Sequence, residues 1–415
     1  MTKLINTDKN VAKLIELERL RQEESLILIA SENYASKSIL EAQASEFINK
    51  YAEGYPHKRY YGGCEIADQI EELAIKRAKK LFGSEHANVQ AHSGSQANMA
   101  CYFASIKPGD TILGPRLDQG GHLTHGSPVN FSGILYNVIS YGVTKDTETI
   151  DYDQVKHLAH KYRPKIIIAG FTAYSRKIDY AKFREICDEI NAILLCDIAH
   201  IAGLIAAKIH QSPIPYADLI SSTTQKTLRG PRGGLILSKE KWAKKIDRGI
   251  FPKTQGGPFI NVIAAKAVCF KEALTNSFKE YQKKVVKNAK TLGKILEENG
   301  LRIVSGGTDT HMILVDLTSF KITGQEAETI LSSVNISANK NTIPYDPLPP
   351  RITSGLRLGT PAITTRGFKE NEMQILGELI ATVLKNPSNS KIQTLVKNKV
   401  LKLAQKFPTP YKNNN

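Results

Sequence analysis

Short apolar runs alternate with amphipathic stretches through the middle of the chain. The runs at 111–114, 138–141, 166–169, 193–196, 218–221 and 234–237 have the length and composition of buried strands. Between several of them lie amphipathic segments, such as the one at 181–190. Alternation of this kind predicts an α/β fold in which a mostly parallel sheet lies between helices.

The pattern changes after about residue 274. A long helical segment at 278–299 leads into apolar runs at 303–304 and 313–315, a helix from Gln325 and a final amphipathic helix at 391–407. Residues 1–24 are charged throughout and predict an amphipathic helix. We therefore expect an N-terminal helical arm at 1–45, a large domain at 46–275 and a smaller C-terminal α/β domain at 276–415.

The composition is that of an ordinary globular protein, with 41% hydrophobic and 23% charged residues. Residues 1–24 lack the apolar core of a secretory signal, and the longest apolar stretches are far shorter than the roughly 20 residues that cross a bilayer. The five cysteines are scattered and form no CxxC pair, which argues against a disulfide framework or a zinc ribbon. We expect a cytoplasmic protein with reduced thiols and no contact with a membrane.

The net charge of +16 is the unusual bulk property. A basic surface can attract nucleic acid, membranes or anionic small molecules. The lysines are spread over the whole chain, however, without an aromatic-spaced basic patch or a known nucleic-acid motif. We interpret the charge as a solvated surface and expect no nucleic-acid partner, while a benefit for phosphorylated or carboxylated ligands stays open.

Lys226 is the first candidate for chemistry. It follows the apolar run at 218–221 and precedes a glycine-rich turn, in the sequence Ser-Ser-Thr-Thr-Gln-Lys-Thr-Leu-Arg-Gly-Pro-Arg-Gly-Gly from Ser221 to Gly234. A lysine in such a partly dry site can lose its proton and attack an aldehyde. On local sequence alone, an ordinary solvated loop lysine is the more common explanation.

Asp197 and His200 stand at the end of the apolar run at 193–196. In a parallel sheet, ligands bind beyond the carboxyl ends of the strands. An aspartate there can keep the ring nitrogen of pyridoxal phosphate protonated, so that the ring withdraws electrons. His200, three residues on, can lie beside the same ligand. The alternative is a helix-capping aspartate with an incidental histidine.

Two further segments fit the same ligand. Gly94 and Ser95 lie in the segment 91–98, where small and hydroxyl residues at a helix start can expose backbone N–H groups to a phosphate. Serine is also a common N-cap, so this motif is weak by itself. His122 offers a flat imidazole that can stack on a ring. Its neighbour His125 suggests a metal pair, but no third ligand accompanies them and we expect no metal.

Arg357 lies in the strand-like segment 354–361. Its guanidinium can hold a substrate carboxylate through two parallel hydrogen bonds, although an interdomain ion pair is an equal alternative. Nearer the N-terminus, Glu53, Tyr60 and Tyr61 form an aromatic, acid-bearing segment. In isolation this segment is an ordinary structured loop.

Together these segments resemble the serine hydroxymethyltransferase family over nearly the whole chain. The matching stretches lie at 28–33, 51–56, 59–64, 92–98, 120–130, 197–203, 226–234, 254–258 and 355–368. The resemblance implies a fold-type-I (aminotransferase-like) enzyme that uses pyridoxal 5'-phosphate, and a homodimer with active sites shared between subunits. The implied reaction moves a one-carbon unit reversibly from L-serine to tetrahydrofolate, giving glycine and 5,10-methylenetetrahydrofolate.

The resemblance also implies roles for individual residues. Lys226 would be the Schiff-base lysine, Asp197 would pair with the ring nitrogen, His122 would stack on the ring, and His200 would support its hydroxyl side. Glu53 would be the acid–base carboxyl near the serine hydroxyl and the folate. The other implied residues are Ser95, Gly94 and Thr172 for the cofactor, with Tyr51 and Gly257 from the neighbouring subunit; Ser31 and Arg357 for the amino acid, with Tyr61 from the partner; and Leu117, Gly121, Leu123 and Asn341 for folate.

Some positions depart from the family pattern. Gln225 stands where the family usually has histidine just before the Schiff-base lysine, and glutamine cannot titrate near neutral pH. Thr172 replaces a usual serine and keeps the hydroxyl. The remaining departures are Pro115, Arg116, Gln119, Lys253, Asn261 and Arg351.

Two alternative functions stay open. One is a folate-independent β-hydroxy-amino-acid aldolase on the same fold, which the residues that match the folate site argue against. The other is a basic nucleic-acid-binding protein on a decayed enzyme scaffold, which the complete set of catalytic residues argues against.

Overall fold

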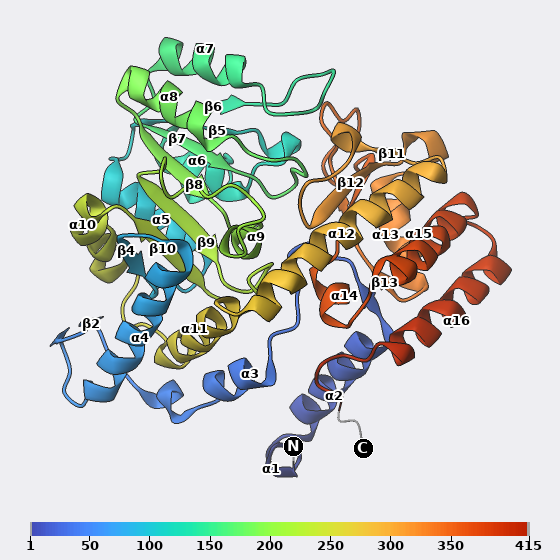
Figure 1. Ribbon diagram of the computed structural model, residues 1–415, viewed down its shortest axis with the longest axis horizontal. Helices are drawn as coiled ribbons and strands as arrows, with labels where there is room; N and C mark the ends of the chain where they lie inside the picture. The colour runs from blue at the N-terminus through green and yellow to red at the C-terminus, as the bar shows by residue number, and fades with distance from the viewer. Residues whose placement is uncertain (1, 413–415) are drawn as a thin grey trace.

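A mixed sheet forms the centre of the larger lobe (Figure 1). In the computed structural model, which describes residues 2–412, seven strands build this sheet in the order β4-β10-β9-β8-β7-β5-β6. They are β4 (His86–Asn88), β5 (Thr111–Pro115), β6 (Asn137–Tyr141), β7 (Ile166–Gly170), β8 (Ile193–Asp197), β9 (Leu219–Thr223) and β10 (Gly234–Ser238). The strands from β9 to β6 are parallel, and β10 is antiparallel to β9 and β4. The predicted mostly parallel sheet is confirmed, and each predicted strand is present with small shifts at its ends.

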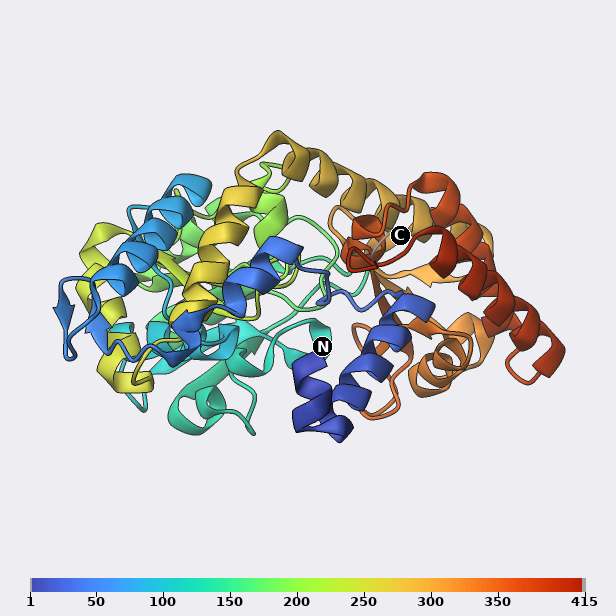
Figure 2. The same cartoon turned by 90° about the horizontal axis from the view of Figure 1, so that it is seen from below.

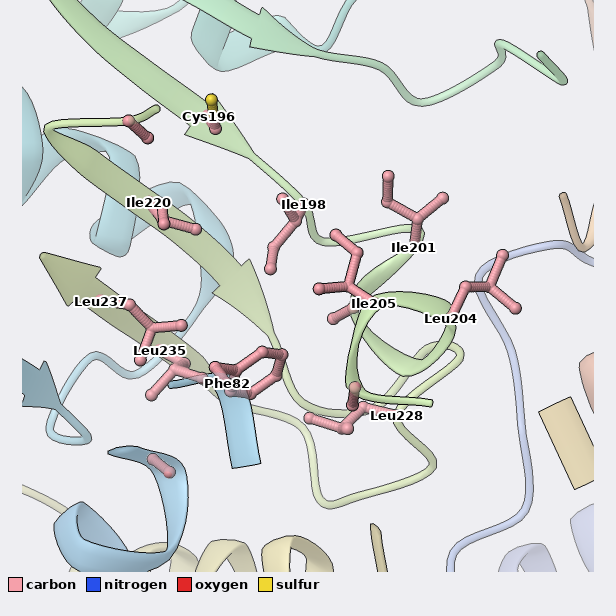
Figure 3. Close-up of a cluster of buried hydrophobic side chains, with 14 of the residues drawn as sticks. Phe82, Cys196, Ile198, Ile201, Leu204, Ile205, Ile220, Leu228, Leu235 and Leu237 are labelled. Atoms are coloured by element: carbon pink, nitrogen blue, oxygen red, sulfur yellow. The ribbon is translucent and has the colours of Figure 1, made fainter. Parts of the chain in front are cut away.

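The sheet is buried on both faces, which explains why its strands are continuous apolar runs. In β8, Leu194 and Cys196 join one hydrophobic cluster and Leu195 joins another, because successive side chains of a strand point to opposite faces. Figure 3 shows part of the first cluster, in which Leu235 of β10 lies beside Phe82. The helices of this lobe are α3 (Lys37–Gln43), α4 (Glu65–Phe82), α5 (Gly94–Ser105), α6 (Phe131–Leu135), α7 (Tyr152–Tyr162), α8 (Tyr180–Ile190), α9 (Ala202–Ala206), α10 (Ala243–Arg248) and α11 (Ile260–Ala273).

The strand register brings the carboxyl ends of three neighbouring strands level. Gly170 of β7 pairs with Asp197 of β8, and Asp197 pairs with Ser221 of β9. Asp197 is therefore central at this edge of the sheet, and the loop that follows β9 carries Lys226. This is the edge at which an open parallel sheet binds its ligands.

A second, antiparallel sheet forms the smaller lobe, in the order β11-β12-β15-β14. Its strands are β11 (Arg302–Ile303), β12 (Met312–Asp316), β14 (Asn339–Asn341) and β15 (Gly355–Gly359), and its helices are α12 (Asn276–Glu298), α13 (Gly324–Ser333), α14 (Pro361–Thr365), α15 (Glu370–Lys385) and α16 (Ser390–Lys406). In Figure 1, α12 runs from the larger lobe to the smaller one. The helices and strands predicted for this part of the chain are confirmed with shifts of one or two residues.

The N-terminal segment forms two helices, α1 (Thr2–Thr7) and α2 (Lys9–Glu24), where the sequence predicted one. Asp8 divides them because its backbone is extended and its side chain accepts hydrogen bonds from the amides of Asn10 and Val11, which starts a new helix. Figure 2 shows the two helices side by side. Beyond α2, β1 (Leu26–Ile27) pairs with β13 (Ile336–Ser337), so this segment is tied to the smaller lobe.

The expected arm includes Met1 and the expected small domain includes residues 413–415. These residues lie outside the described part of the chain. Within 2–412, no helix has the length and apolar character needed to cross a bilayer. The five cysteines are free and buried.

A short hairpin of β2 (Gly54–Tyr55) and β3 (Lys58–Arg59) projects from the larger lobe (Figure 1).

Candidate active site

A cavity of about 290 Å³ opens at the carboxyl edge of the larger sheet. Its walls come from the ends of β7, β8 and β9, the start of α5, the loop after β5, and β15 of the smaller lobe. It gathers these residues predicted from the sequence: Ser31, Gly94, Ser95, His122, Thr172, Asp197, His200, Lys226 and Arg357. Segments separated by hundreds of residues in the chain thus contribute to one pocket.

Lys226 lies in the loop after β9 and faces this cavity. Protein atoms surround its ammonium closely, and this burial, with the nearby Arg357 and Arg232, lowers the pKa of Lys226 to about 8 although Asp197 opposes the shift. Near neutral pH, a fraction of the lysine is therefore uncharged. An uncharged amine is the nucleophilic form, so Lys226 is suited to join an aldehyde.

Asp197 is fixed by three hydrogen bonds. Its Oδ2 accepts from His125 Nε2 at 3.1 Å and from Asn98 Nδ2 at 2.8 Å, and its Oδ1 accepts from the amide of Ala199 at 3.0 Å. Burial alone would raise the pKa of Asp197, but the hydrogen bonds from His125 and Asn98 outweigh this effect, so the pKa lies below its usual range. Asp197 therefore keeps its negative charge and can hold a ring nitrogen in its protonated form.

His122 contributes a neutral, flat ring to the cavity. Its Nδ1 lies 2.7 Å from Thr124 Oγ1 and accepts the amide of Thr124 at 3.2 Å, which sets the orientation of the ring. Burial, with smaller effects from His125 and Lys226, lowers the pKa of His122 to about 4. An uncharged imidazole held in this way can stack on an aromatic ligand.

His200 and His311 form a buried, stacked pair. His200 Nδ1 lies 3.3 Å from His311 Nε2, and the ring centroids are 5.5 Å apart. Burial holds the pKa of His200 well below its usual value and lowers that of His311 to about 3, so both rings are neutral. Within residues 2–412 His200 Nε2 has no hydrogen-bond partner, which leaves this nitrogen ready for a ligand in the cavity that His200 lines.

The start of α5 forms one wall of the cavity. Ser93 caps this helix by accepting the amide of Gln96, and the first helical residue is Gly94. A Cβ on Gly94 would lie 2.6 Å from Thr223 Cγ2, so no other residue fits without a shift. The first amides of a helix have no partner inside the helix, and they can bind an anionic oxygen.

Arg357 enters the cavity from β15. Its Nε donates to Asn339 Oδ1 at 3.2 Å and its Nη1 to the carbonyl of Thr172 at 2.9 Å, which ties the smaller lobe to the end of β7. Burial lowers the pKa of Arg357 to about 10, so the guanidinium stays charged at neutral pH. Its remaining N–H groups can bind a carboxylate beside Ser31.

Tyr51, Glu53, Tyr61 and Gly257 lie outside the cavity and form a second cluster. The Tyr51 hydroxyl donates to Glu53 Oε1 at 3.4 Å, and its ring meets that of Tyr61 edge to face with centroids 5.1 Å apart. A Cβ on Gly257 would contact Tyr51 Cε1 at 3.4 Å. Tyr51 is 57% exposed. A single chain therefore exposes the two tyrosine rings of this cluster, while Glu53 and Gly257 are half-buried beside them.

The four residues matched to the folate site also lie outside the cavity walls. Leu117 and Leu123 are exposed on either side of Gly121, which packs so tightly that a Cβ would lie 2.4 Å from the carbonyl oxygen of Pro115. Asn341 ends β14, and its Nδ2 donates to the carbonyl of Thr342 at 2.7 Å. Leu123 directly follows His122, so this loop borders the cavity.

Sequence reasoning missed several groups at the site. It considered His125 only for a metal pair, whereas the structure bonds this residue to Asp197, and it assigned no role to Asn98 or His311. Gln225 lines the cavity and accepts the amide of Gly233 at 3.4 Å. Among residues 2–412, no group of three or more His, Cys, Asp or Glu side chains is arranged to hold a metal ion.

The family model described as serine hydroxymethyltransferase matches residues 4–380. The matched region contains every residue that lines the cavity.

Proposed function

The chain belongs to the serine hydroxymethyltransferase family, and from this premise we propose that the cavity around Lys226 is its catalytic site. The enzyme transfers a one-carbon unit reversibly between L-serine and tetrahydrofolate, with glycine and 5,10-methylenetetrahydrofolate as the products. Its cofactor is pyridoxal 5'-phosphate. The observation that carries the proposal is that Lys226, of lowered pKa, and a charged Asp197 line the same cavity.

The chemistry of the cavity fits this cofactor. The start of α5, where Gly94 has no side chain, can bind a phosphate through its backbone amides. The anionic Asp197 can pair with a protonated ring nitrogen, and the unpartnered Nε2 of His200 can bond to a ring hydroxyl. When bound, pyridoxal phosphate supplies a protonated ring that takes up the electrons released as the Cα–Cβ bond of serine breaks. In this arrangement Lys226 would hold the cofactor through its aldehyde and His122 would lie against its ring.

The remaining cavity residues position the cofactor and the amino acid. We assign Ser95 and Gly94 to the phosphate and Thr172 to the cofactor. Arg357 and Ser31 hold the carboxylate of serine, and the contact of Arg357 with the Thr172 carbonyl keeps the guanidinium at the cavity wall. Fixing the carboxylate orients the Cα–Cβ bond that breaks, which is the protein's share of the catalysis.

A second copy of the chain supplies what the cavity of one chain lacks. We propose a homodimer in which Tyr51, Tyr61, Gly257 and Glu53 of each subunit complete the partner's cavity. The exposure of Tyr51 and Tyr61 in the single chain, with Glu53 in contact with Tyr51, supports the assignment. Glu53 would then exchange a proton with the serine hydroxyl, and Leu117, Gly121, Leu123 and Asn341 would line the folate site next to it.

Location and domain limits are part of the same proposal. A cytoplasmic location accords with five free, buried cysteines. We keep the division into an arm at 1–45, a large domain at 46–275 and a small domain at 276–415. Separate hydrophobic clusters support the division into two lobes, with Leu26 and Leu28 of the arm packed into the cluster of the smaller lobe.

The assay of the proposed function is folate-dependent turnover. Purified protein loaded with pyridoxal phosphate should convert serine to glycine only when tetrahydrofolate is present. Absence of this folate-dependent conversion would reject the function. Threonine cleavage without folate that exceeds serine turnover would favour an aldolase on the same fold.

A further inference from the structure

Lys266 is a buried cation behind the start of α5. It belongs to α11, its side chain is 1% exposed, and its Nζ donates to three backbone carbonyls: Val89 at 2.6 Å, Ala91 at 3.0 Å and Gly234 at 2.8 Å. An ammonium has three hydrogens, so this set satisfies all of them.

These three partners include no carboxylate. The carboxylate of Glu71 favours the charge of Lys266, but its own oxygens accept from Arg59 at 2.6 Å and Gln90 at 2.8 Å. Burial lowers the pKa of Lys266 to about 7. A buried ammonium without an ion pair is costly, and an apolar residue of similar size would fill the same space.

The three carbonyls belong to the segment that leads into α5 and to the strand beside it. Val89 and Ala91 precede the capping residue Ser93, and the amide of Gly234 donates to the Ala91 carbonyl at 2.9 Å. A Cβ on Gly234 would lie 2.4 Å from the Ser93 carbonyl oxygen, so the two backbones are in direct contact. Lys266 therefore fixes the position of the backbone from which α5 starts.

We propose that Lys266 is a positioning residue for the cofactor's phosphate, acting through the backbone of residues 89–95. This inference rests on the proposed function, in which Gly94 and Ser95 bind that phosphate. The ammonium holds the carbonyls of Val89 and Ala91 on its own side of the segment. It leaves the first amides of α5 turned to the cavity, and in its protonated form it adds a positive charge behind them that favours a dianion.

A comparison of the affinities for pyridoxal phosphate and for pyridoxal distinguishes this positioning role of Lys266 from a purely structural role. Pyridoxal has the ring and aldehyde of pyridoxal phosphate but no phosphate, so both ligands use Lys226 and Asp197 and only one uses the start of α5. We expect apo Lys266→Met to bind pyridoxal phosphate about tenfold or more weakly than wild type. Its affinity for pyridoxal should stay within about twofold of wild type.

The measurement is titration of the dialysed apoenzyme with each ligand, followed by absorbance and protein fluorescence. Lys271→Met, which removes an exposed lysine from the same helix, is the matched control and should bind both ligands as wild type does. Equal losses for the two ligands in Lys266→Met, or no loss for either, would overturn the proposal.

A second variant keeps the test decisive if Lys266→Met does not fold. The Cβ of Gly233→Ala would meet Lys266 Cε at 2.5 Å, so this change displaces the ammonium without removing it. Gly233→Ala should weaken the binding of pyridoxal phosphate and leave the binding of pyridoxal nearly unchanged. An equal loss of affinity for the two ligands, or no loss for either, would reject the role of Lys266. Wild-type protein that binds neither ligand would instead overturn the proposed function itself.

Discussion

The Nε2 atom of His125 lies 3.1 Å from the Oδ2 atom of Asp197. The backbone amide of His122 donates to the other ring nitrogen, His125 Nδ1, at 3.2 Å. Because Nδ1 accepts a hydrogen bond, Nε2 must carry the proton that it donates to Asp197. The loop that brings His122 into the cavity therefore also fixes the histidine that keeps Asp197 charged.

Replacing His125 by alanine should weaken the site through Asp197. Loss of this hydrogen bond removes the largest effect that lowers the pKa of Asp197, so the pKa rises and the carboxylate holds the ring nitrogen less well. A hydrogen bond to a charged group contributes about 1.5–3 kcal/mol, so kcat should fall by about 10- to 150-fold. Steady-state kinetics measure this, with the exposed His157→Ala as control. Unchanged kcat in His125→Ala would show that Asp197 does not depend on this contact.

The attachment of the cofactor should follow the ionisation of Lys226. Burial lowers the folded-state pKa to about 8, and only the uncharged amine attacks an aldehyde. The rate at which apoenzyme takes up pyridoxal phosphate should therefore rise about tenfold from pH 6 to 7 and level off above about pH 8. Stopped-flow absorbance measures this rate. A rise that continues to the ordinary pKa of a lysine would contradict the lowered value.

The lowered pKa of Lys226 also predicts how the stability of the apoenzyme depends on pH. Since the pKa of Lys226 is lower in the folded state than in the unfolded state, the folded apoenzyme binds this proton less tightly. The resulting cost is fully present below about pH 8 and disappears as the pH rises toward the ordinary lysine pKa. Lys226→Met should therefore stabilise the apoenzyme below about pH 8, and urea unfolding at several pH values measures the difference. Equal stability of the two proteins throughout this pH range would contradict the burial of the charge.

Arg357→Lys should impair serine binding more than cofactor binding. Lysine keeps the charge but lacks the two parallel donors that match a carboxylate, so KM for serine should rise by about tenfold or more. Affinity for pyridoxal phosphate should stay close to that of wild type. Arg248→Lys, at an exposed position, is the control. A larger loss of cofactor affinity than of serine affinity would remove Arg357 from the substrate carboxylate.

Mixing two inactive variants tests the shared site. In a heterodimer of Lys226→Ala and Glu53→Gln, one cavity has both changes and the other has neither. About half of the randomly reassociated dimers are mixed, so about a quarter of wild-type activity should return. Lys226→Ala mixed with Asp197→Ala should stay inactive, because those residues share one subunit's cavity. If no activity returns in the mixture of Lys226→Ala and Glu53→Gln, Glu53 of one subunit does not complete the Lys226 cavity of the other.

The strands of the larger sheet could be predicted because burial on both faces makes each of them a continuous apolar run. The polar residues at their ends could be predicted because each run stops where the first polar residue follows. Asp197 and Lys226 follow such runs directly. The break at Asp8 was also visible in principle, since aspartate is a common N-cap, but the continuous charge pattern hid it.

Contacts made by loops could not be predicted in the same way. His125 reaches Asp197 only because its loop folds back over the end of β8, across 72 residues of sequence. Lys266 meets carbonyls 177, 175 and 32 residues away, and nothing in its local sequence distinguishes it from an ordinary helical lysine. Such pairings depend on tertiary packing, which local periodicity does not encode.

The central claim is that Lys226 is the lysine that joins the cofactor. Borohydride reduction of protein loaded with pyridoxal phosphate fixes the cofactor to the lysine that holds it, and peptide mass spectrometry then identifies the site. We predict that the label is on the peptide containing Lys226 and that the near-visible absorption band is absent from Lys226→Ala. Label on another lysine, or persistence of the band in Lys226→Ala, would contradict the account.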